Sequence, residues 1–395
     1  MDRYYTQTRP RIVEYCGGGS GHGSDWDSEF VVCGLDQDRR FRFMDNSELD
    51  AILDTGADVY RSLWSRQGSL FFLDLEYKNT RDPEEVYRNR FDIFKTSLEP
   101  VYGRLFSILQ SFRIAFMTIM TATGYHFVFA VPFDTPEHRR LAGLGNPCPE
   151  LREQYARVYP VGHRQRPVPP ECGRAFDGLG RLAEFLVKDL NPESNIPTEA
   201  GILHARQILL DLSTYADPLH IRFIRCVGSY HQKSAHHRYA TMIRHHPRGS
   251  GLSLKDLLTL ACSPEEAAEY IHSTPAVIPQ AGEGLPDLLA AYQSSELHRS
   301  HQEFDAHHVD DEEMSLTRKL LLTFSDQDLA HDSGLKQAVF QGYCQGIHPR
   351  AVGLMAAERL RQASWDTPIM AWATEREDGY NPDSRALFWT RLFGT

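Results

Sequence analysis

Short apolar runs and stretches of helical spacing alternate along the first 250 residues. Four to eight consecutive or alternating apolar residues favour strands, and apolar residues every three to four positions favour helices. Strands are predicted at 30–33, 59–63, 69–77, 113–120, 126–131, 208–212, 221–227 and 239–243. Helices are predicted at 46–53, at 83–110 with a break or kink at Pro100, and at 179–190. This pattern predicts an α+β fold for this part of the chain.

The pattern changes near residue 250. Helical spacing then dominates, with segments expected at 252–262, 264–271, 315–324, 335–345 and 349–363. The Pro- and Gly-containing stretch 273–285 is interpreted as a linker, 303–313 as a solvated acidic segment, and 132–178 as an inserted loop region. We therefore expect two domains, residues 1–250 and a helical domain at 251–395.

Composition indicates the expected cellular compartment and the kinds of charged partner that the protein could bind. Seven cysteines are scattered without a CxxC pair, which favours a reducing compartment over a disulfide framework. No apolar segment resembles a signal peptide or a membrane span, so the expected location is cytoplasmic, or nucleoid-associated in a bacterium. The net charge of −11 argues against a coat of positive charge for duplex DNA. Residues 204–248 nevertheless carry an excess of basic side chains, which suits a local polyanion site or a solvated basic face.

The stretch Leu70–Tyr77, LFFLDLEY, places two acids at the end of an apolar strand. Alternate residues of a strand share a face, so Asp74 and Glu76 are expected on one face, with Leu73 and Leu75 on the other. Two carboxylates on one face repel each other unless a divalent cation lies between them. The alternative is a strand end whose acids are solvated.

Two further segments add chemistry of the same kind. Gly124-Tyr125-His126 lies in a predicted hairpin, and Asp211 follows the apolar run 208–210, with Asp217 as a rival acid. The next strand carries Arg222 and Arg225, three residues apart and so on opposite faces of a regular strand, and Arg222 is favoured for the site. Its following turn carries Ser229, His231 and Lys233. Nucleotidyl transfer needs carboxylates for two metal ions and cationic or donor groups for a triphosphate, and these segments supply both.

In order and spacing, these motifs resemble those of the archaeo-eukaryotic primase superfamily, and within it the primase-polymerases. FFLDLEY is similar to the family's first motif, and LLDLSTYADPLHIRFIRCVGSYHQKS to its third. The second motif departs from the family, because Gly124 stands where serine is usual, although Thr123 offers a hydroxyl nearby. The resemblance covers residues 55–245 and implies an RRM-like antiparallel sheet with a second α/β layer.

The resemblance also implies roles for residues and partners. Asp74, Glu76 and Asp211 would be catalytic and hold two Mg²⁺ or Mn²⁺ ions; the nucleotide would be bound by His126, Arg222, Arg225, Ser229, His231 and Lys233. The expected activity is template-directed nucleotidyl transfer by a DNA primase or polymerase, in replication, repair or mobile-element maintenance. Single-stranded DNA template, primer and dNTP or NTP would be its substrates, and a helicase or other replication protein is a candidate partner.

Other interpretations stay open. Cys148, His163 and Cys172 lie where some relatives bind zinc, but their spacing matches no short zinc motif, so free thiols are favoured. His236-His237 and His245-His246 are adjacent in strands and point apart, which favours a basic surface. The rival functions are a rolling-circle-type metal-dependent endonuclease and a non-catalytic nucleic-acid-binding protein.

Overall fold

The computed structural model describes most of the chain. The described residues are 3–19, 26–34, 41–157, 167–188, 190, 195–201, 204–232, 237–245, 252–363 and 381–395. Among them, no helix is long and apolar enough to cross a membrane.

The larger of the sheets has six strands in the order β12-β5-β6-β4-β8-β7. They are β4 (Gly68–Asn79), β5 (Met117–Met120), β6 (Gly124–Pro132), β7 (Thr198–Glu199), β8 (Arg206–Asp211) and β12 (Met242–Ile243). Strand β4 lies inside the sheet, antiparallel to both β6 and β8. Only the short β7–β8 pair is parallel among the described strands. The predicted α+β class with antiparallel sheet is confirmed at this level.

A smaller, antiparallel sheet has the order β2-β1-β3-β9. Its strands are β1 (Val31–Gly34), β2 (Phe41–Met44), β3 (Asp58–Ser62) and β9 (Phe223–Arg225). Strands β10 (Tyr230–His231) and β11 (Tyr239–Ala240) form a two-stranded sheet. The predicted strand at 221–227 therefore contributes to the smaller sheet, and the preceding strand β8 to the larger one.

One face of the larger sheet is buried under helices. Leu73 and Leu75 are fully buried, and their cross-strand partners Phe127 and Tyr125 pack against Tyr102 of helix α5 (Glu99–Ser111). Helix α8 (Pro170–Lys188) packs against β4 and α5. Asp74 and Glu76 alternate with these leucines and are only half-buried, so the acids lie on the opposite face.

The other helices surround this centre. Before residue 250 they are α1 (Arg3–Tyr15), α2 (Leu49–Asp54), α3 (Glu85–Arg88), α4 (Arg90–Ile93), α6 (Pro136–Leu144) and α7 (Pro149–Ala156). After it come α9 (Leu254–Ala261), α10 (Pro264–Ser273), α11 (Leu285–Ser294), α12 (Glu296–Ala306), α13 (Asp311–Leu321), α14 (Asp326–Ala330), α15 (Asp332–Tyr343), α16 (Pro349–Gln362) and α18 (Pro382–Gly394).

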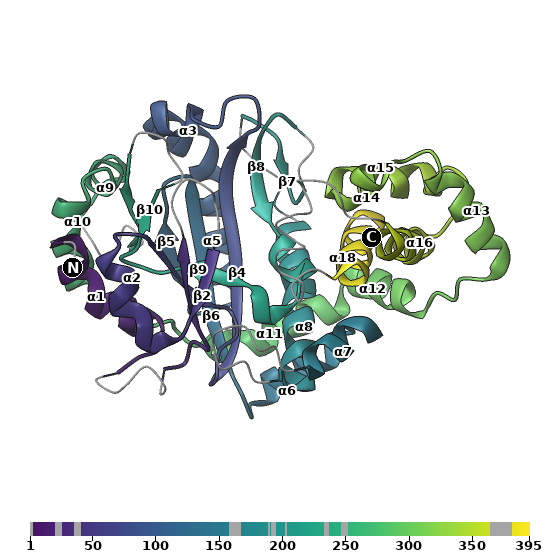
Figure 1. Cartoon of the computed structure of the whole chain (residues 1–395), viewed down its shortest axis with the longest axis horizontal. Helices are drawn as coiled ribbons and strands as arrows, with labels where there is room; N and C mark the ends of the chain where they lie inside the picture. Colours follow the sequence, from purple (N-terminus) through teal and green to yellow (C-terminus); the bar gives the residue numbers. More distant parts are fainter. Residues whose placement is uncertain are drawn as a thin grey trace.

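The helices after residue 250 lie in three places (Figure 1). Helices α9 and α10 lie beside α1, where Arg11 Nε donates to the His272 carbonyl at 2.8 Å. Helices α13 to α16 and α18 gather at the far end of the molecule, and α11 packs on α6 and α8. The C-terminal region is mostly helical, as expected, whereas its extent as a separate domain stays a prediction.

The prediction of a loop region at 132–178 is wrong in the described residues. This stretch contains α6, α7 and the start of α8. Pro136, Pro149 and Pro170 each begin a helix, where a missing N–H costs nothing because first-turn N–H groups have no helical acceptor. Prolines interpreted as loop residues are therefore helix starts.

The prediction that 273–285 is a linker is also wrong. The Ala130 N–H donates to the Pro279 carbonyl at 2.8 Å, and the Ala281 N–H to the Ala130 carbonyl at 2.9 Å. Ala276 and Ala281 are buried. The segment thus extends the hydrogen bonding of β6 and is part of the packed core.

The predicted helix at 83–110 is interrupted before Pro100. Short helices α3 and α4 lead into a π-helical turn at Phe94–Leu98, and α5 then begins with Pro100 in its first turn. The break therefore precedes the proline, which is tolerated at a helix start.

Candidate functional site

Three of the predicted site residues form a row across the larger sheet. In the strand register, Asp74 of β4 is opposite His126 of β6 on one side and opposite Asp211 of β8 on the other. Directly opposed residues of antiparallel strands project from the same face. His126 Nε2 lies 3.6 Å from Asp74 Oδ1, and the Phe72 ring meets the imidazole edge-on.

Glu76 extends this row along β4, and we call the row of His126, Asp74 and Asp211 together with Glu76 the acidic row. It lies two residues beyond Asp74, on the same face, opposite Gly124 and Leu209. A Cβ atom at Gly124 would lie 1.9 Å from the Leu75 carbonyl oxygen. The backbone of β6 thus passes too close to β4 for a side chain at this position. Thr123 beside it is buried.

The structure separates Asp211 from its rival Asp217. Asp211 is half-buried at the end of β8 and accepts the Ser213 N–H at 2.8 Å. Asp217 is buried and forms ion pairs with Arg222 and Arg385. Only Asp211 shares the row with Asp74, so the choice of Asp211 over Asp217 is favoured by position.

The donor set at this face suits a hard divalent cation. Asp74, Glu76 and Asp211 offer carboxylate oxygens, the ligands that Mg²⁺ and Mn²⁺ prefer. Directly opposed like charges in a sheet destabilise each other, and a cation would offset that repulsion. Among the described residues, no three His, Cys, Asp or Glu side chains are close enough together to form a metal site. The backbone thus aligns the acids, and metal binding would require their side chains to rotate toward one another.

The two arginines enter different clusters. Arg222 donates to the Ser213 carbonyl at 2.6 Å and forms an ion pair with Asp217. Ser213 in turn donates its N–H to Asp211, so Arg222 lies near Asp211. Arg225 is buried, pairs with Asp58 and donates to the Tyr60 hydroxyl at 2.6 Å. Burial opposes the charge of Arg225, but Asp58 and Tyr60 raise its pKa well above the usual range.

The turn after β9 is only partly described. The Ser229 hydroxyl is buried, accepts the Val59 N–H at 2.7 Å and donates to the Tyr230 carbonyl at 2.8 Å. His231 Nδ1 accepts the Ala122 N–H at 3.4 Å, beside the turn that leads to Gly124. Lys233 lies outside the described residues. The nucleotide-binding roles of this turn stay predictions.

Tyr87 of α3 stacks on Tyr239 of β11, with ring centroids 5.4 Å apart. Burial and the charge of Glu84 raise the pKa of the Tyr87 phenol; Arg225 lowers it and Glu76 raises it.

The suggested zinc ligands are described in part. Burial raises the pKa of Cys148 to about 12 and that of Cys172 to about 11, which disfavours the thiolate that zinc binds. His163 lies outside the described residues, as do His236 and His246. His237 and His245 are exposed, as the interpretation of a basic surface expects.

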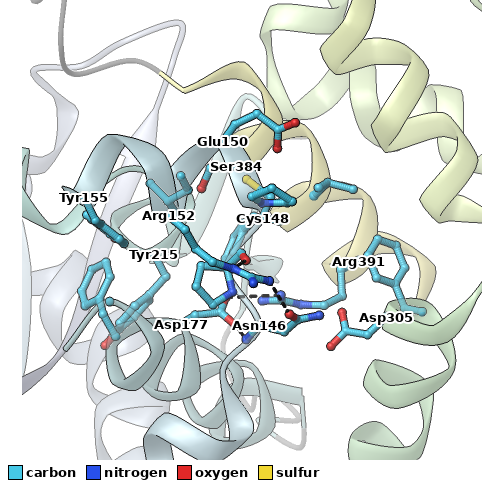
Figure 2. A pocket seen from close by; sticks show the side chains of 18 of the residues that line it. Asn146, Cys148, Glu150, Arg152, Tyr155, Asp177, Tyr215, Asp305, Ser384 and Arg391 are labelled. Atoms are coloured by element: carbon cyan, nitrogen blue, oxygen red, sulfur yellow. Dashed lines mark hydrogen bonds and ion pairs between the residues drawn. The ribbon is translucent and has the colours of Figure 1, made fainter. Parts of the chain in front are cut away.

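A cavity of about 320 Å³ lies elsewhere, where α18 meets α8 and the segment before α7. Figure 2 shows Arg391, Asp177 and Asp305 among the residues around it. Of the described residues predicted to hold Mg²⁺ or Mn²⁺ or to bind the nucleotide, none lines it, whereas Cys148, a suggested zinc ligand, does. Tyr215, at its edge, exchanges two hydrogen bonds with the Phe72 backbone of β4, at 3.0 and 2.9 Å.

Buried ion pairs next to the cavity link α18 to α8. Arg391 Nη2 donates to Glu184 at 2.6 Å, and His301 Nε2 lies 2.9 Å from the same carboxylate. Burial disfavours the charged form of Glu184, but Arg391 and His301 stabilise it more, and its pKa falls to about 2. This cluster supports the structure and lies apart from the acidic row.

Sequence reasoning missed three residues around the row: Ser213, which donates to Asp211; Tyr215, which completes the hydrogen bonding of β4; and Arg385, which reaches Asp217 from α18. Ser213 and Tyr215 follow Asp211 closely in the sequence, so their position near it could have been predicted. Nothing in the sequence pattern pairs Arg385 with Asp217 across 168 positions.

Comparisons of the chain with protein-family models, curated proteins and solved structures found no match.

Proposed function

We propose that the protein is a primase-polymerase that adds nucleotides to a 3′ end on a single-stranded DNA template, using two divalent metal ions. The observation that carries this proposal is the register that aligns Asp74 with Asp211, with Glu76 on the same face. The finer fold, that of an archaeo-eukaryotic primase core, belongs to the same proposal, as does a cytoplasmic location.

In this proposal, Asp74, Glu76 and Asp211 hold the metal ions. Ions bound there would supply Lewis-acid chemistry for the transfer of a nucleotide. His126 beside Asp74 would contact a phosphate. Arg222, which is partly exposed beside Ser213, would contact the triphosphate.

The rival functions fit this geometry less well. A rolling-circle endonuclease needs two histidines on one strand face with a tyrosine nucleophile, whereas the row contains one histidine and two acids. A protein that only binds nucleic acid gains nothing from carboxylates aligned beside phosphates.

The test is primer extension with the purified full-length protein, labelled nucleotides, a single-stranded template and Mg²⁺ or Mn²⁺, with and without primer. Asp74→Asn and Asp211→Asn should each lower the rate about a hundredfold or more, because each removes a metal ligand. Asp92→Asn, at an exposed position of α4, is the matched control and should retain the rate. Absence of product from the wild type, or full product from Asp74→Asn, would overturn the proposal.

A further inference from the structure

The cavity beside α18 is walled by segments that lie far apart in the sequence. The segment before α7 and the helices α7, α8, α12, α16 and α18 all contribute to its lining (Figure 2). Its volume of about 320 Å³ is at the lower end of the range that small-molecule sites occupy. The lining belongs entirely to residues that the structure describes. Packed helices thus leave a space that fits a small organic molecule.

One part of the lining is aromatic. The rings of Phe176 on α8 and Tyr215 have centroids 5.0 Å apart, and Phe304 and Phe388 contribute further rings from α12 and α18. All of these rings are buried. Leu354 of α16, which is half-buried, adds an aliphatic side chain. A flat ring suits such walls, because its burial there removes apolar surface from water and allows stacked or edge-on contacts.

Two arginines of the lining have no carboxylate partner in the described part of the chain. Arg152 of α7 donates to the Pro147 carbonyl at 2.7 Å and to Asn146 Oδ1 at 3.1 Å (Figure 2). Arg350 of α16 donates to the Phe304 carbonyl at 3.1 Å. Neutral oxygens thus orient both guanidinium groups and leave their charges uncompensated. A guanidinium group of this kind is suited to bind a phosphate or a carboxylate.

The carboxylates of the lining, in contrast, each lie beside an arginine. Asp177 lies 3.0 Å from Arg181 Nε and 3.5 Å from Arg391 Nη1, and Asp305 lies 2.9 Å from Arg181 Nη2. Burial disfavours the charged form of Asp177, but the two arginines stabilise it more, and its pKa falls well below the usual range. Glu150 lies 3.7 Å from an arginine of α16. The charged groups of the lining that lack a partner of opposite sign are therefore cationic.

We propose that this cavity binds a small organic anion, in which a flat ring carries one phosphate or carboxylate group. The ring lies against the aromatic side chains, and the anionic group binds Arg152 and Arg350 by charge-assisted hydrogen bonds. Ring and anion act together, because an inorganic ion would leave the rings in contact with water and an uncharged ring would leave both guanidinium charges uncompensated. The inference goes beyond the proposed function, since none of the described residues predicted to bind metal or nucleotide lines this cavity.

The test is isothermal titration calorimetry of the full-length protein without divalent metal. Adenosine 5′-monophosphate and indole-3-acetate are the probes, so that a phosphate and a carboxylate are compared on flat rings. At least one should bind with a dissociation constant below about 100 μM, and the tighter probe identifies the preferred anionic group. Inorganic phosphate, acetate, adenosine and indole, each with one half of the proposed ligand, should bind about tenfold more weakly or not at all.

Variants connect binding with the cavity. Arg152→Gln and Arg350→Gln should each weaken binding of the tighter probe about tenfold, because a charged hydrogen bond is lost. Leu354→Trp should weaken it at least as strongly, because the larger side chain fills the cavity while every charge remains. Arg174→Gln is the matched control, since Arg174 is exposed on α8 outside the lining, and it should bind like the wild type.

Arg152 is itself exposed, so its variant should fold even where Leu354→Trp does not, and circular dichroism checks both. The inference would be overturned by a wild type that binds neither probe, by inorganic phosphate or an uncharged ring that binds as tightly as the probe, or by unchanged binding in the folded arginine variants. Binding lost in Asp74→Asn but kept in Arg152→Gln would overturn it too, because the probe would then lie at the acidic row. Primer extension does not enter this test, so failure of the proposed function would leave its outcome unaffected.

Discussion

Gly124 of β6 lies opposite Glu76 of β4, beside the acidic row. Its position opposite Glu76 leaves no room for a Cβ atom, which would meet the Leu75 carbonyl and the Glu76 backbone. Glycine at position 124 is therefore a requirement of this backbone.

Gly124→Ser should lower the free energy of unfolding by about 1–3 kcal/mol, because the strands must separate to admit the side chain. Chemical denaturation measures this. Gly103→Ala is the control: a Cβ at Gly103 meets nothing within 4 Å, and α5 should gain about 0.5–1 kcal/mol from the better helix former. A Gly124→Ser protein as stable as the wild type would show that β4 and β6 are far enough apart to admit a side chain.

At the residue scale, the acids were predictable and their surroundings were only partly so. The alternation of Leu73, Asp74, Leu75 and Glu76 reveals the face of each side chain without any tertiary knowledge. The partner of Asp217 on α18 could not be foreseen, because no local rule connects residues so far apart in the chain.

At the scale of elements, the sequence pattern does not always show whether a segment is a helix, a strand or a loop, and its hydrogen-bonding partners then decide. Strands rich in apolar residues were located to within a few positions, as β4 and β6 show. Proline was misread in 132–178 because it marks both loops and first helical turns. The segment before α11 was misread because its partner, β6, lies about 150 positions away.

The segment 274–281 should resist limited proteolysis by an unspecific protease such as thermolysin. Its backbone is bonded to Ala130, and two of its alanines are buried, so cleavage requires local unfolding. Mass spectrometry of the early fragments gives the cleavage sites. An early cut within 274–281, ahead of cuts elsewhere, would favour the linker interpretation.

At the scale of the whole molecule, buried charges connect the C-terminal helix to the sheet core. Arg391 of α18 pairs with Glu184 of α8, and His301 of α12 completes the cluster. Removal of one partner leaves a buried charge uncompensated, which is far more costly than loss of a surface ion pair.

Arg391→Met should lower the free energy of unfolding by about 3–5 kcal/mol, measured by urea denaturation at neutral pH. Arg318→Met is the control, because its ion pair with Glu358 is exposed, and it should cost less than about 1 kcal/mol. Similar losses in both variants would mean that the Arg391 cluster is solvated.

The same cluster predicts how stability depends on pH. The pKa of Glu184 falls from its ordinary 4.5 to about 2 in the folded protein, so the unfolded chain binds its proton first. Its contribution is therefore complete above pH 4.5 and is lost as the pH falls toward 2. Urea midpoints across this range should decline in the wild type and decline less in Glu184→Gln. Parallel curves for the two proteins would contradict the assignment.

The Tyr215 hydroxyl, which both accepts from and donates to the backbone of Phe72, has a further consequence. Strand β8 ends at Asp211, and beyond it the edge of β4 would otherwise expose an unpaired N–H and C=O. Such an edge is a template on which a second chain can add a strand and begin to aggregate. The Tyr215 phenol forms hydrogen bonds with both of these groups. The chain can therefore leave the sheet at Asp211, which makes the acidic row accessible to solvent, while the N–H and C=O of Phe72 stay paired and cannot bind a strand of another molecule.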